Sequence, residues 1–589
     1  MKIIDPERKA VSISEFFDKN KQMLGFDSPQ KALFMTVKEA IDNSLDACGD
    51  HGILPDITLE IENVEQDKFK VTVTDNGPGI PRKEVADSFG KMLYGSRFHL
   101  VRQTRGQQGL GITAAIMYAQ KTTGLPADII TKTKDDVTAF HFILEINVKK
   151  NEPLIHSIEP IIWNVNSGLK ISLVLKGKIV GGKQSIEEYI RQTAIANPHA
   201  SFHVFLPERK FEIERSINEA PKIPEAVKPH PHGVELGELM SILREREKEP
   251  IEKIISDSFS RITSNISKEI VHKSGLSQKS VSQLHQKDFE NLWNTMQSFD
   301  FMEPNKESLS PIGEEALYKS VLNSFEDMHP AYFSMPVSKG PFVYSGHPFI
   351  IEAIAVYGGN IPKEEPVKIL RFTNRVPLLY QQGSCAITKA ISSISWNQYG
   401  LSQPVKDQLP IGPVIMVVHI ASTKIPYTSE AKEAVAPVPE ILDSLDVVIK
   451  KIGRQIRAMK TKEEHKTHVE EKFSLIEQII PAISKKASSI LRMEEPDIKP
   501  IISKVMGVVA FREIDGKLFA ENYTEERLSF TVLLKGEGEW RQKVNNLAPF
   551  EKVELNFDRE IIDSSEIYVN LPDSKLLGAY SLPEVLKNE

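Results

Sequence analysis

EAIDNSLDAC, residues 39–48, contains polar side chains at spacings of three, four and seven, namely Glu39, Asp42, Asn43 and Asp46. Apolar side chains alternate with them: Ile41, Leu45 and Cys48. In a helix these spacings place the polar groups in one stripe and the apolar groups on another face. Such a polar stripe is commonly no more than a solvated face, and it is also what a site lined by carboxylates and an amide requires. The surrounding sequence has to separate these two interpretations.

A tight turn follows the predicted helix. DNGPGI, residues 75–80, ends the alternating strand KVTVT. An aspartate at a strand end can accept a hydrogen bond from an exocyclic amine, and the glycines after it let a flat ring approach the backbone. The same residues are equally compatible with a plain hairpin turn.

A glycine cluster comes third. RGQQGLGIT, residues 105–113, places Gly106, Gly109 and Gly111 at the entrance to a predicted helix. Glycines expose backbone N–H groups there, and the helix N-terminus adds partial positive charge, so the stretch suits phosphate groups. Each motif alone is weak; their order along the chain is more specific.

Length and composition limit the classes of protein. A chain of 589 residues is expected to form roughly three to five domains. Its cysteines, Cys48 and Cys385, cannot build a disulfide framework or a usual structural zinc site, which favours a reducing cytoplasm. The start MKIIDPERKA lacks a signal-peptide core, and no apolar run approaches the ~20 residues that span a bilayer. We therefore expect a soluble cytoplasmic protein without a membrane partner.

Charge restricts how the chain could bind nucleic acid. A net charge of −7 gives no general attraction, so any contact needs a local basic patch. One candidate is KKIGRQIRAMKTK, residues 450–462, with the cations Lys450, Lys451, Arg454, Arg457, Lys460 and Lys462. A charged, merely solvated helix explains the same run equally well.

The pattern of elements predicts several parts. Helices alternate with mostly antiparallel strands up to residue 228, which predicts a two-layer α/β domain. A linker with His230 and His232 and then short helices follow up to 308, and mixed α/β returns up to about 425. The next stretch, up to Leu491, is compatible with a helix far longer than usual, typical of a lever or stalk. Short strands at the end predict a small β-sandwich.

The motif order E-x-x-D-N-x-x-D, D-N-G-x-G and G-x-x-G-x-G resembles the Bergerat nucleotide-binding fold of the GHKL ATPases. Within that group, EAIDNSLDAC, DNGPGI and YGSRFHLVRQTRGQQGLGIT are most similar to the B subunits of type IIB DNA topoisomerases (topoisomerase VI). The resemblance implies an α+β multidomain chain with these parts: a Bergerat ATP-binding domain with an N-terminal strap at 1–228, a helix-two-turns-helix domain at 229–308, a transducer with a long C-terminal helix at 309–500, and an Ig-like β-sandwich at 501–589.

The resemblance also implies roles for residues of the site. Glu39 would be the general base for the attacking water, and Asn43 would hold Mg²⁺ through its amide oxygen. Asp75 would accept from the adenine amino group in a pocket shaped by Gly77 and Gly79. The lid over the phosphates would comprise Ser96, Arg97, Gly106, Gln107, Gln108, Gly109, Leu110, Gly111, Ile112 and Thr113. Asp42 and Asp46 are expected to be structural.

A lysine ahead of the long helix is implied to reach the γ-phosphate of ATP. Lys432, in SEAKEA, fits the loop pattern best, and Lys424, in ASTKIP, is the second choice. A lysine in such a loop is otherwise an ordinary solvated charge. Because the contact exists only while the γ-phosphate does, hydrolysis would release the transducer.

Two features depart from the pattern. The family commonly has threonine after glycine in a late strand of the first domain, where this chain has Leu169; Ser167 or Ser172 could substitute for its adenine contact. GKIVGGKQS, residues 177–185, nearly fits a P-loop, but Gln184 stands where the Mg²⁺-binding hydroxyl belongs, so we interpret it as an ordinary loop.

The implied function is that of an ATP-operated gate. Two B subunits would dimerise on binding ATP and Mg²⁺, trap duplex DNA, and drive a separate cleaving A subunit in an A₂B₂ heterotetramer associated with the nucleoid. Double-strand passage would relax supercoils and separate linked circles. The alternative is a Bergerat-fold clamp of chaperone or mismatch-repair type that acts on proteins. A chaperone of this group would be expected to have a long acidic linker after its first domain, and this chain has no such stretch. A mismatch-repair clamp would lack the helical insert.

Overall fold

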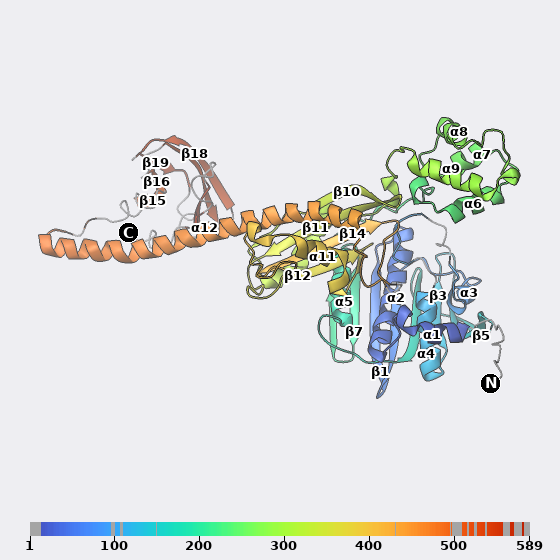
Figure 1. Cartoon of the computed structure of the whole chain (residues 1–589). Coiled ribbons are helices and arrows are strands. Elements are labelled where there is room, and N and C mark those ends of the chain that lie inside the picture. Colours follow the sequence, from blue (N-terminus) through green and yellow to red (C-terminus); the bar gives the residue numbers. More distant parts are fainter. Residues whose placement is uncertain are drawn as a thin grey trace, which may run out of the picture. The chain divides into compact units, whose positions relative to one another are not determined.

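The structure is a computed structural model (Figure 1) that describes these residues: 13–95, 101–106, 110–148, 150–429, 432–494, 496, 509–514, 517–522, 527–535, 539–549, 551–557, 566–570 and 580–581. The chain divides into two compact units, Met1–Arg457 and Ala458–Glu589. Of the predicted N-terminal strap, residues 1–12 lie outside the described ones, and helix α1, Ile13–Leu24, begins directly after them.

A mostly antiparallel sheet of eight strands forms the first domain, in the order β5-β4-β3-β6-β2-β1-β7-β8. Its strands are β1 Asp56–Glu65, β2 Lys68–Asp75, β3 Ala127–Lys132, β4 Ala139–Asn147, β5 Glu152–Ile161, β6 Gly168–Lys176, β7 Ser201–Leu206 and β8 Arg209–Ile213. The helices α2 Pro29–Asp50, α4 Gly111–Thr123 and α5 Ile186–Ala196 share one hydrophobic core with it. This two-layer arrangement confirms the predicted α+β class.

The sequence patterns missed two edge strands of this sheet, β5 and β8. Strand β5 contains two prolines and has a largely exposed face, so it lacks the clean apolar alternation of a half-buried strand. Strand β8 has only five residues. Edge strands pair on one side alone, and their sequences are therefore less constrained.

Helix α2 carries the polar stripe, and its boundaries follow from local chemistry. The Ser28 hydroxyl accepts a hydrogen bond from the Lys31 N–H at 3.3 Å, and Pro29 occupies the first helical position. Leu33, Val37 and Ile41, four residues apart, are 0% exposed and fix the buried face. The helix predicted around EAIDNSLDAC, residues 39–48, is thus observed as part of Pro29–Asp50.

The stretch PRKEVADSFGKMLYG, residues 81–95, has a helical pattern that extends well beyond the helix that forms there. Only α3, Val85–Gly90, forms, because Lys91 leaves the helical conformation with φ −125° and ψ 127°. Gly90 packs so closely on Pro153 that a Cβ there would lie 2.4 Å from the proline Cβ. This contact with strand β5 is tertiary and has no signature in the local sequence.

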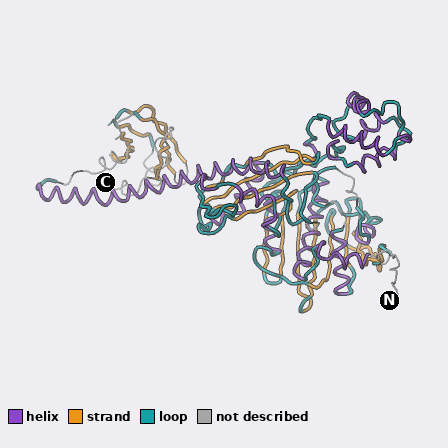
Figure 2. Tube along the Cα trace, viewed as in Figure 1, coloured by secondary structure: helices purple, strands orange, loops and turns teal. Residues whose placement is uncertain are grey.

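Four short helices follow, built around their own core (Figure 2): α6 Leu236–Glu245, α7 Ile251–Ser258, α8 Ser264–Lys273 and α9 Gln286–Ser298. The two linker histidines are structural here, as their rings bond backbone carbonyls. His230 Nε2 lies 3.1 Å from the Met302 oxygen, and His232 Nε2 lies 2.9 Å from the Phe299 oxygen. These contacts tie the linker to the end of the helical segment.

A second sheet has the order β10-β11-β14-β12-β13, with β9 paired to β11. Its strands are β9 Tyr332–Phe333, β10 Val337–Tyr344, β11 His347–Tyr357, β12 Lys368–Thr373, β13 Val376–Pro377 and β14 Val414–Ser422. Strand β14 is buried along its whole length. The helices of this part are α10 Glu314–Phe325, α11 Ala386–Ser393 and α12 Pro439–Leu491.

Helix α12 has 53 residues, which agrees with the long helix that the sequence predicts. Beyond it, two small sheets are described. One contains β15 Val509–Ile514, β16 Lys517–Asn522 and β19 Lys552–Leu555; the other contains β17 Leu528–Lys535, β18 Glu539–Leu547, β20 Glu566–Asn570 and β21 Tyr580–Ser581. The bounds of the four predicted domains remain predictions.

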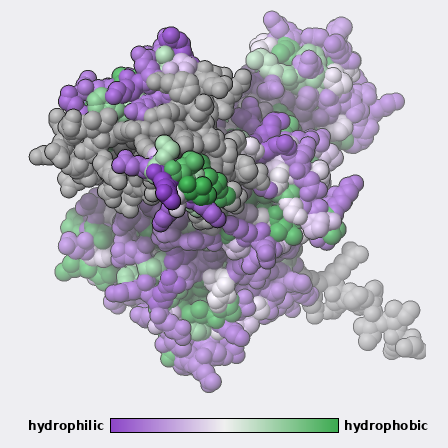
Figure 3. Space-filling model, turned by 90° about the vertical axis from the view of Figure 1, so that its left-hand side faces the viewer, coloured by the Kyte–Doolittle hydropathy of each residue, from purple (hydrophilic) through white to green (hydrophobic). Residues whose placement is uncertain are grey.

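Among the residues that Figure 3 colours by hydropathy, hydrophilic ones predominate, and hydrophobic ones occur in small groups. Among the described residues, no helix is both long enough and apolar enough to span a membrane.

Candidate ATP site

A cavity of about 170 Å³ lies between α2, the end of β2, β6, α3 and the start of α4. Its walls are mainly apolar, from Ala40, Ala47, Pro78, Ile80, Phe89, Ile112, Leu169 and Ile171. A few polar groups converge on it: Asn43, Ser44, Asp75 and Ser88. Apolar walls with few polar groups are typical of sites that hold a flat heterocycle. Asn43 of the polar stripe and the DNGPGI turn, through Asp75, Pro78, Gly79 and Ile80, therefore meet at one cavity.

Asp75 lies at the base of this cavity and is 6% exposed. Its Oδ2 accepts from the Ser44 hydroxyl at 2.7 Å, and its Oδ1 accepts from the Gly77 and Leu169 N–H groups at 2.9 and 3.2 Å. Burial raises the pKa of the Asp75 carboxyl, and these three hydrogen bonds oppose that rise. Ser44 was not among the residues predicted from the sequence, although its i−2 and i+2 neighbours on α2 belong to the polar stripe.

Glycine is required in the turn after Asp75. Gly79 has φ +70°, and a Cβ there would lie 2.1 Å from the Lys132 carbonyl oxygen. Leu169, where threonine was expected, contributes its backbone N–H to Asp75 and its side chain to the cavity wall. Ser172 does not replace that threonine, because its hydroxyl pairs with the Thr72 hydroxyl at 3.0 Å on the other side of the strand.

Glu39 and Asn43 lie one turn apart on α2. Asn43 is exposed and lines the cavity, whereas Glu39 is 22% exposed and its Oε1 lies 3.5 Å from Lys38 Nζ. Gly111, the first residue of α4, packs directly on the Glu39 carboxylate: a Cβ at 111 would lie 1.8 Å from Glu39 Oε2. Gly111 therefore leaves room for the Glu39 carboxylate.

The remaining acids of the stripe have structural partners, as expected. Asp42 accepts from Lys38 Nζ at 2.7 Å and from the Tyr189 hydroxyl at 3.0 Å. Asp46 pairs with Arg105 at 2.7 Å. Burial disfavours the Lys38 charge, but the carboxylates of Asp42 and Glu39 outweigh it and raise the pKa of Lys38. Lys38 therefore stays charged beside Glu39, a feature that the sequence did not indicate.

The predicted lid is described only in part. Leu110 precedes α4 and accepts from the Thr113 hydroxyl at 3.1 Å, so that hydroxyl faces its own helix. Ile112 reaches the cavity wall, and the loop before Gly106 is held through Arg105. The other lid residues lie outside the described ones: Ser96, Arg97, Gln107, Gln108 and Gly109.

Lys432 reaches the loop ahead of α4, of which residues 101–106 are described and which we call the phosphate loop. Its Nζ donates to the Arg105 carbonyl oxygen at 2.8 Å, across 327 positions of sequence. Burial, followed by the nearby Lys38 charge, lowers the pKa of Lys432. Its neighbour Glu433 pairs with Lys31 of α2 at 2.7 Å. Lys424, the second choice, is exposed, so Lys432 is the lysine that the structure brings to this loop.

The near P-loop at 177–185 leads into α5, and the Ser185 hydroxyl caps that helix by accepting from the Glu188 N–H at 3.0 Å. Its geometry suits the interpretation as an ordinary loop. No set of three His, Cys, Asp or Glu side chains that could hold a metal ion occurs among the described residues. A metal here would need oxygen ligands from a nucleotide and water besides Asn43.

Gly111→Ala is expected to lower kcat for ATP hydrolysis by about 10²-fold, because the new methyl group must displace the Glu39 carboxylate. The fold should persist, since Gly111 begins a helix in which alanine is favourable. Steady-state hydrolysis beside the melting temperature measures both effects. Gly49→Ala is the matched control, because a Cβ there meets nothing within 4 Å. An unchanged kcat in Gly111→Ala would show that the carboxylate position is unimportant.

Comparison with known proteins agrees with this geometry. Residues 31–171 match the family of histidine kinase-, DNA gyrase B- and HSP90-like ATPases, and residues 304–472 match the transducer of the topoisomerase VI B subunit. The B subunit of type 2 DNA topoisomerase 6 from Archaeoglobus fulgidus is 43% identical over 86% of this chain and 84% of its own. That from Methanococcoides burtonii is 38% identical over 99% of this chain and 94% of its own. The chain therefore belongs to the family of type 2 DNA topoisomerase 6 B subunits.

Proposed function

We propose that this chain is the ATP-binding and ATP-hydrolysing subunit of a type IIB DNA topoisomerase. The observation that supports this most directly is the cavity that Asp75, Asn43 and apolar side chains line together, with Glu39 one turn before Asn43 on α2 and packed against Gly111. In this proposal ATP drives dimerisation of two B subunits, which captures a duplex for strand passage by a separate A subunit.

Each residue of the site has a defined task in this proposal. The Asp75 carboxylate accepts from the adenine amino group, and the apolar walls exclude water around the ring. The N-terminus of α4 faces the phosphates, where unpaired N–H groups favour anions. Asn43 holds Mg²⁺ through its amide oxygen; when bound, the ion neutralises phosphate charge. Glu39 accepts a proton from the attacking water, and the Lys38 ammonium group lies 3.5 Å from its Oε1.

Three partners belong to the proposal: a second B subunit, an A subunit in an A₂B₂ assembly, and duplex DNA in the nucleoid. Large apolar side chains near the C-terminal end of α12 support a protein partner there: Ile483, Ile490 and Leu491 are 63%, 73% and 65% exposed. The basic run at 450–462 supports DNA contact only in part, because Lys450 pairs with Asp446 and Arg457 donates to the Gln398 carbonyl.

The test is ATP hydrolysis by the purified chain with and without supercoiled DNA and an A subunit. We expect DNA to stimulate hydrolysis, added salt to weaken that stimulation, and the two subunits together to relax the DNA. If the rate of ATP hydrolysis is the same with and without DNA and rises with a protein substrate instead, the result would favour the alternative, a clamp of chaperone or mismatch-repair type.

Lys432→Ala is expected to lower kcat for ATP hydrolysis by about 10²-fold, the effect of removing one electrostatic contact to the developing charge. Lys424→Ala removes an equal charge at an exposed position and should leave kcat within about twofold. Parallel steady-state measurements decide between them. Loss of turnover in Lys424→Ala alone would transfer the role to that residue.

A further inference from the structure

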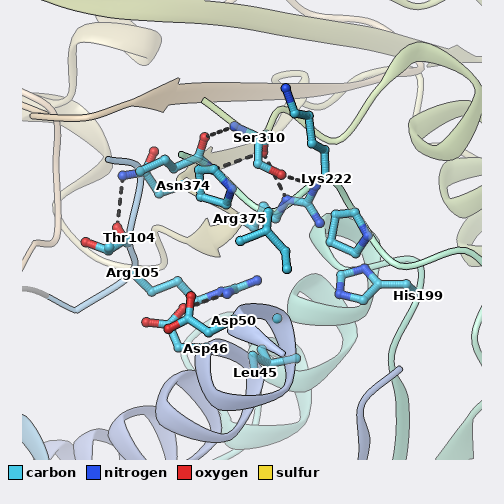
Figure 4. A pocket seen from close by; sticks show the side chains of 15 residues that line it. Leu45, Asp46, Asp50, Thr104, Arg105, His199, Lys222, Ser310, Asn374 and Arg375 are labelled. Atoms are coloured by element: carbon cyan, nitrogen blue, oxygen red, sulfur yellow. Dashed lines mark hydrogen bonds and ion pairs between the residues drawn. The ribbon is translucent and has the colours of Figure 1, made fainter. Parts of the chain in front are cut away.

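Arg105 connects three separate elements at the junction of the first domain with the second sheet. Its Nη1 donates to Asp46 of α2 at 2.7 Å, and both residues are labelled in Figure 4. Its Nη2 donates to the Asn197 side-chain oxygen at 2.5 Å. Its carbonyl oxygen accepts from Lys432 Nζ at 2.8 Å. One residue of the phosphate loop thus contacts the helix that carries Glu39, the end of α5, and the lysine proposed to read the γ-phosphate.

Asn197 links Arg105 to the second sheet. It caps the C-terminus of α5 and is 0% exposed. While its oxygen accepts from Arg105, its Nδ2 donates to the Thr193 carbonyl at 2.8 Å and to the Arg375 carbonyl at 3.1 Å. Every polar atom of this amide is therefore used, and a shift of Arg105 cannot leave Asn197 unaffected without breaking a buried hydrogen bond.

The turn between β12 and β13 accepts the hydrogen bond from Asn197, at the Arg375 carbonyl. Its residues Asn374 and Arg375 have φ +47° and +66°, and Asn374 Nδ2 also donates to the Thr104 carbonyl at 3.1 Å. The Arg375 N–H donates to His419 Nε2 at 3.0 Å, so the proton of this ring lies on Nδ1, which donates to Glu352 at 2.8 Å. The chain of hydrogen bonds thus ends on β11 and β14 in the middle of the second sheet.

The junction contains charges of both signs, and its central side chains are buried. Arg102 pairs with Asp50 at 2.9 Å and Arg105 with Asp46, while Glu352 lies at the far side of Arg375. Arg375, His419 and Glu352 are 4%, 0% and 1% exposed. The Nε atoms of Arg102 and Arg105 have no partner among the described residues, so the network depends on the hydrogen bonds named above, and displacing one member disturbs its neighbours.

We propose that Arg105 and Asn197 are positioning residues that couple the phosphate loop to the Asn374–Arg375 turn of the transducer. The inference rests on the proposed ATP site. In the structure Lys432 is held by the Arg105 carbonyl; a γ-phosphate competes for the same ammonium group. When the Lys432 ammonium group moves to the γ-phosphate, the phosphate loop loses its hydrogen bond to Lys432. The Arg105 guanidinium then shifts, and it displaces Asn197 and the Asn374–Arg375 turn that Asn197 contacts.

Hydrogen exchange on the full chain, with and without the non-hydrolysable ATP analogue AMPPNP, tests the coupling. In the wild type we expect the nucleotide to change exchange both at 101–106 and at 370–378. In Asn197→Ala the change at 101–106 should remain, whereas the change at 370–378 should fall by roughly 3- to 30-fold. Arg105→Lys should behave likewise, because one ammonium group cannot serve Asp46 and Asn197 in the forked geometry of a guanidinium.

Arg102→Lys is the matched control. Arg102 lies in the same loop and contacts the same helix, but it pairs with Asp50 rather than with Asn197. This variant should retain both changes. A full response at 370–378 in both Asn197→Ala and Arg105→Lys would overturn the coupling, and so would its equal loss in Arg102→Lys. A wild-type chain with no change at 101–106 would instead overturn the ATP site itself.

Discussion

Glu39→Gln is expected to lower kcat for ATP hydrolysis by about 10²- to 10⁴-fold while nucleotide affinity changes by only a few-fold. Glutamine keeps the size of the side chain against Gly111, where a Cβ would lie 1.8 Å from the carboxylate, but it cannot accept a proton from water. The loss therefore isolates proton transfer from packing. Single-turnover hydrolysis with an independent binding titration measures the two quantities separately.

The matched control is Asp50→Asn, at the C-terminal end of the same helix. Asp50 pairs with Arg102 at 2.9 Å and lies away from the cavity, so its loss should weaken the loop anchor without abolishing turnover. If Glu39→Gln hydrolyses ATP at the wild-type rate, the polar stripe of α2 is a solvated face and the proposed mechanism is wrong at its first step.

Asp75→Asn is expected to weaken ATP binding by roughly 10- to 100-fold, the value of a hydrogen bond to a charged acceptor. The amide oxygen can still accept one bond, but it competes with the Ser44 hydroxyl and the two N–H groups that already use the carboxylate. The asparagine amide can donate to the oxygen that guanine carries in place of the adenine amine. The ratio of ATP to GTP affinity should therefore fall, and an unchanged ratio would exclude Asp75 as the adenine reader.

The pH dependence of ATP binding follows from the same residue. The ionised carboxylate accepts from the adenine amine more strongly than the protonated acid does, and burial raises the pKa of Asp75 above its usual value of 3.8. Affinity should be full well above that raised pKa and decline as the pH falls through it, at less acidic pH than for an exposed aspartate. The free energy of unfolding depends on pH in the opposite direction. Because the pKa of Asp75 is raised in the folded state, this residue stabilises the fold below its unfolded pKa, and that contribution is lost as the pH rises through the folded pKa. Asp75→Asn should therefore not lower the melting temperature at neutral pH.

Local rules explain why much of the site could be predicted. Helical spacing alone placed Glu39 and Asn43 on one face of α2, because residues three and four apart are neighbours on any helix. The capping residue Ser28 and the left-handed Gly79 likewise obey preferences of the backbone within a few residues. These features need no partner from elsewhere in the chain to be recognised.

Contacts between distant segments set the rest. Lys432, rather than Lys424, meets the phosphate loop because the fold brings together residues 327 positions apart, and spacing carries no information at that separation. The Ser44 bond to Asp75 and the Arg105 link to Asn197 arise in the same way, from packing of α2 and α5 around one core. Side chains that neighbour one another only after folding are chosen by shape and burial, so the residues that tie the site to the second sheet became visible only in three dimensions.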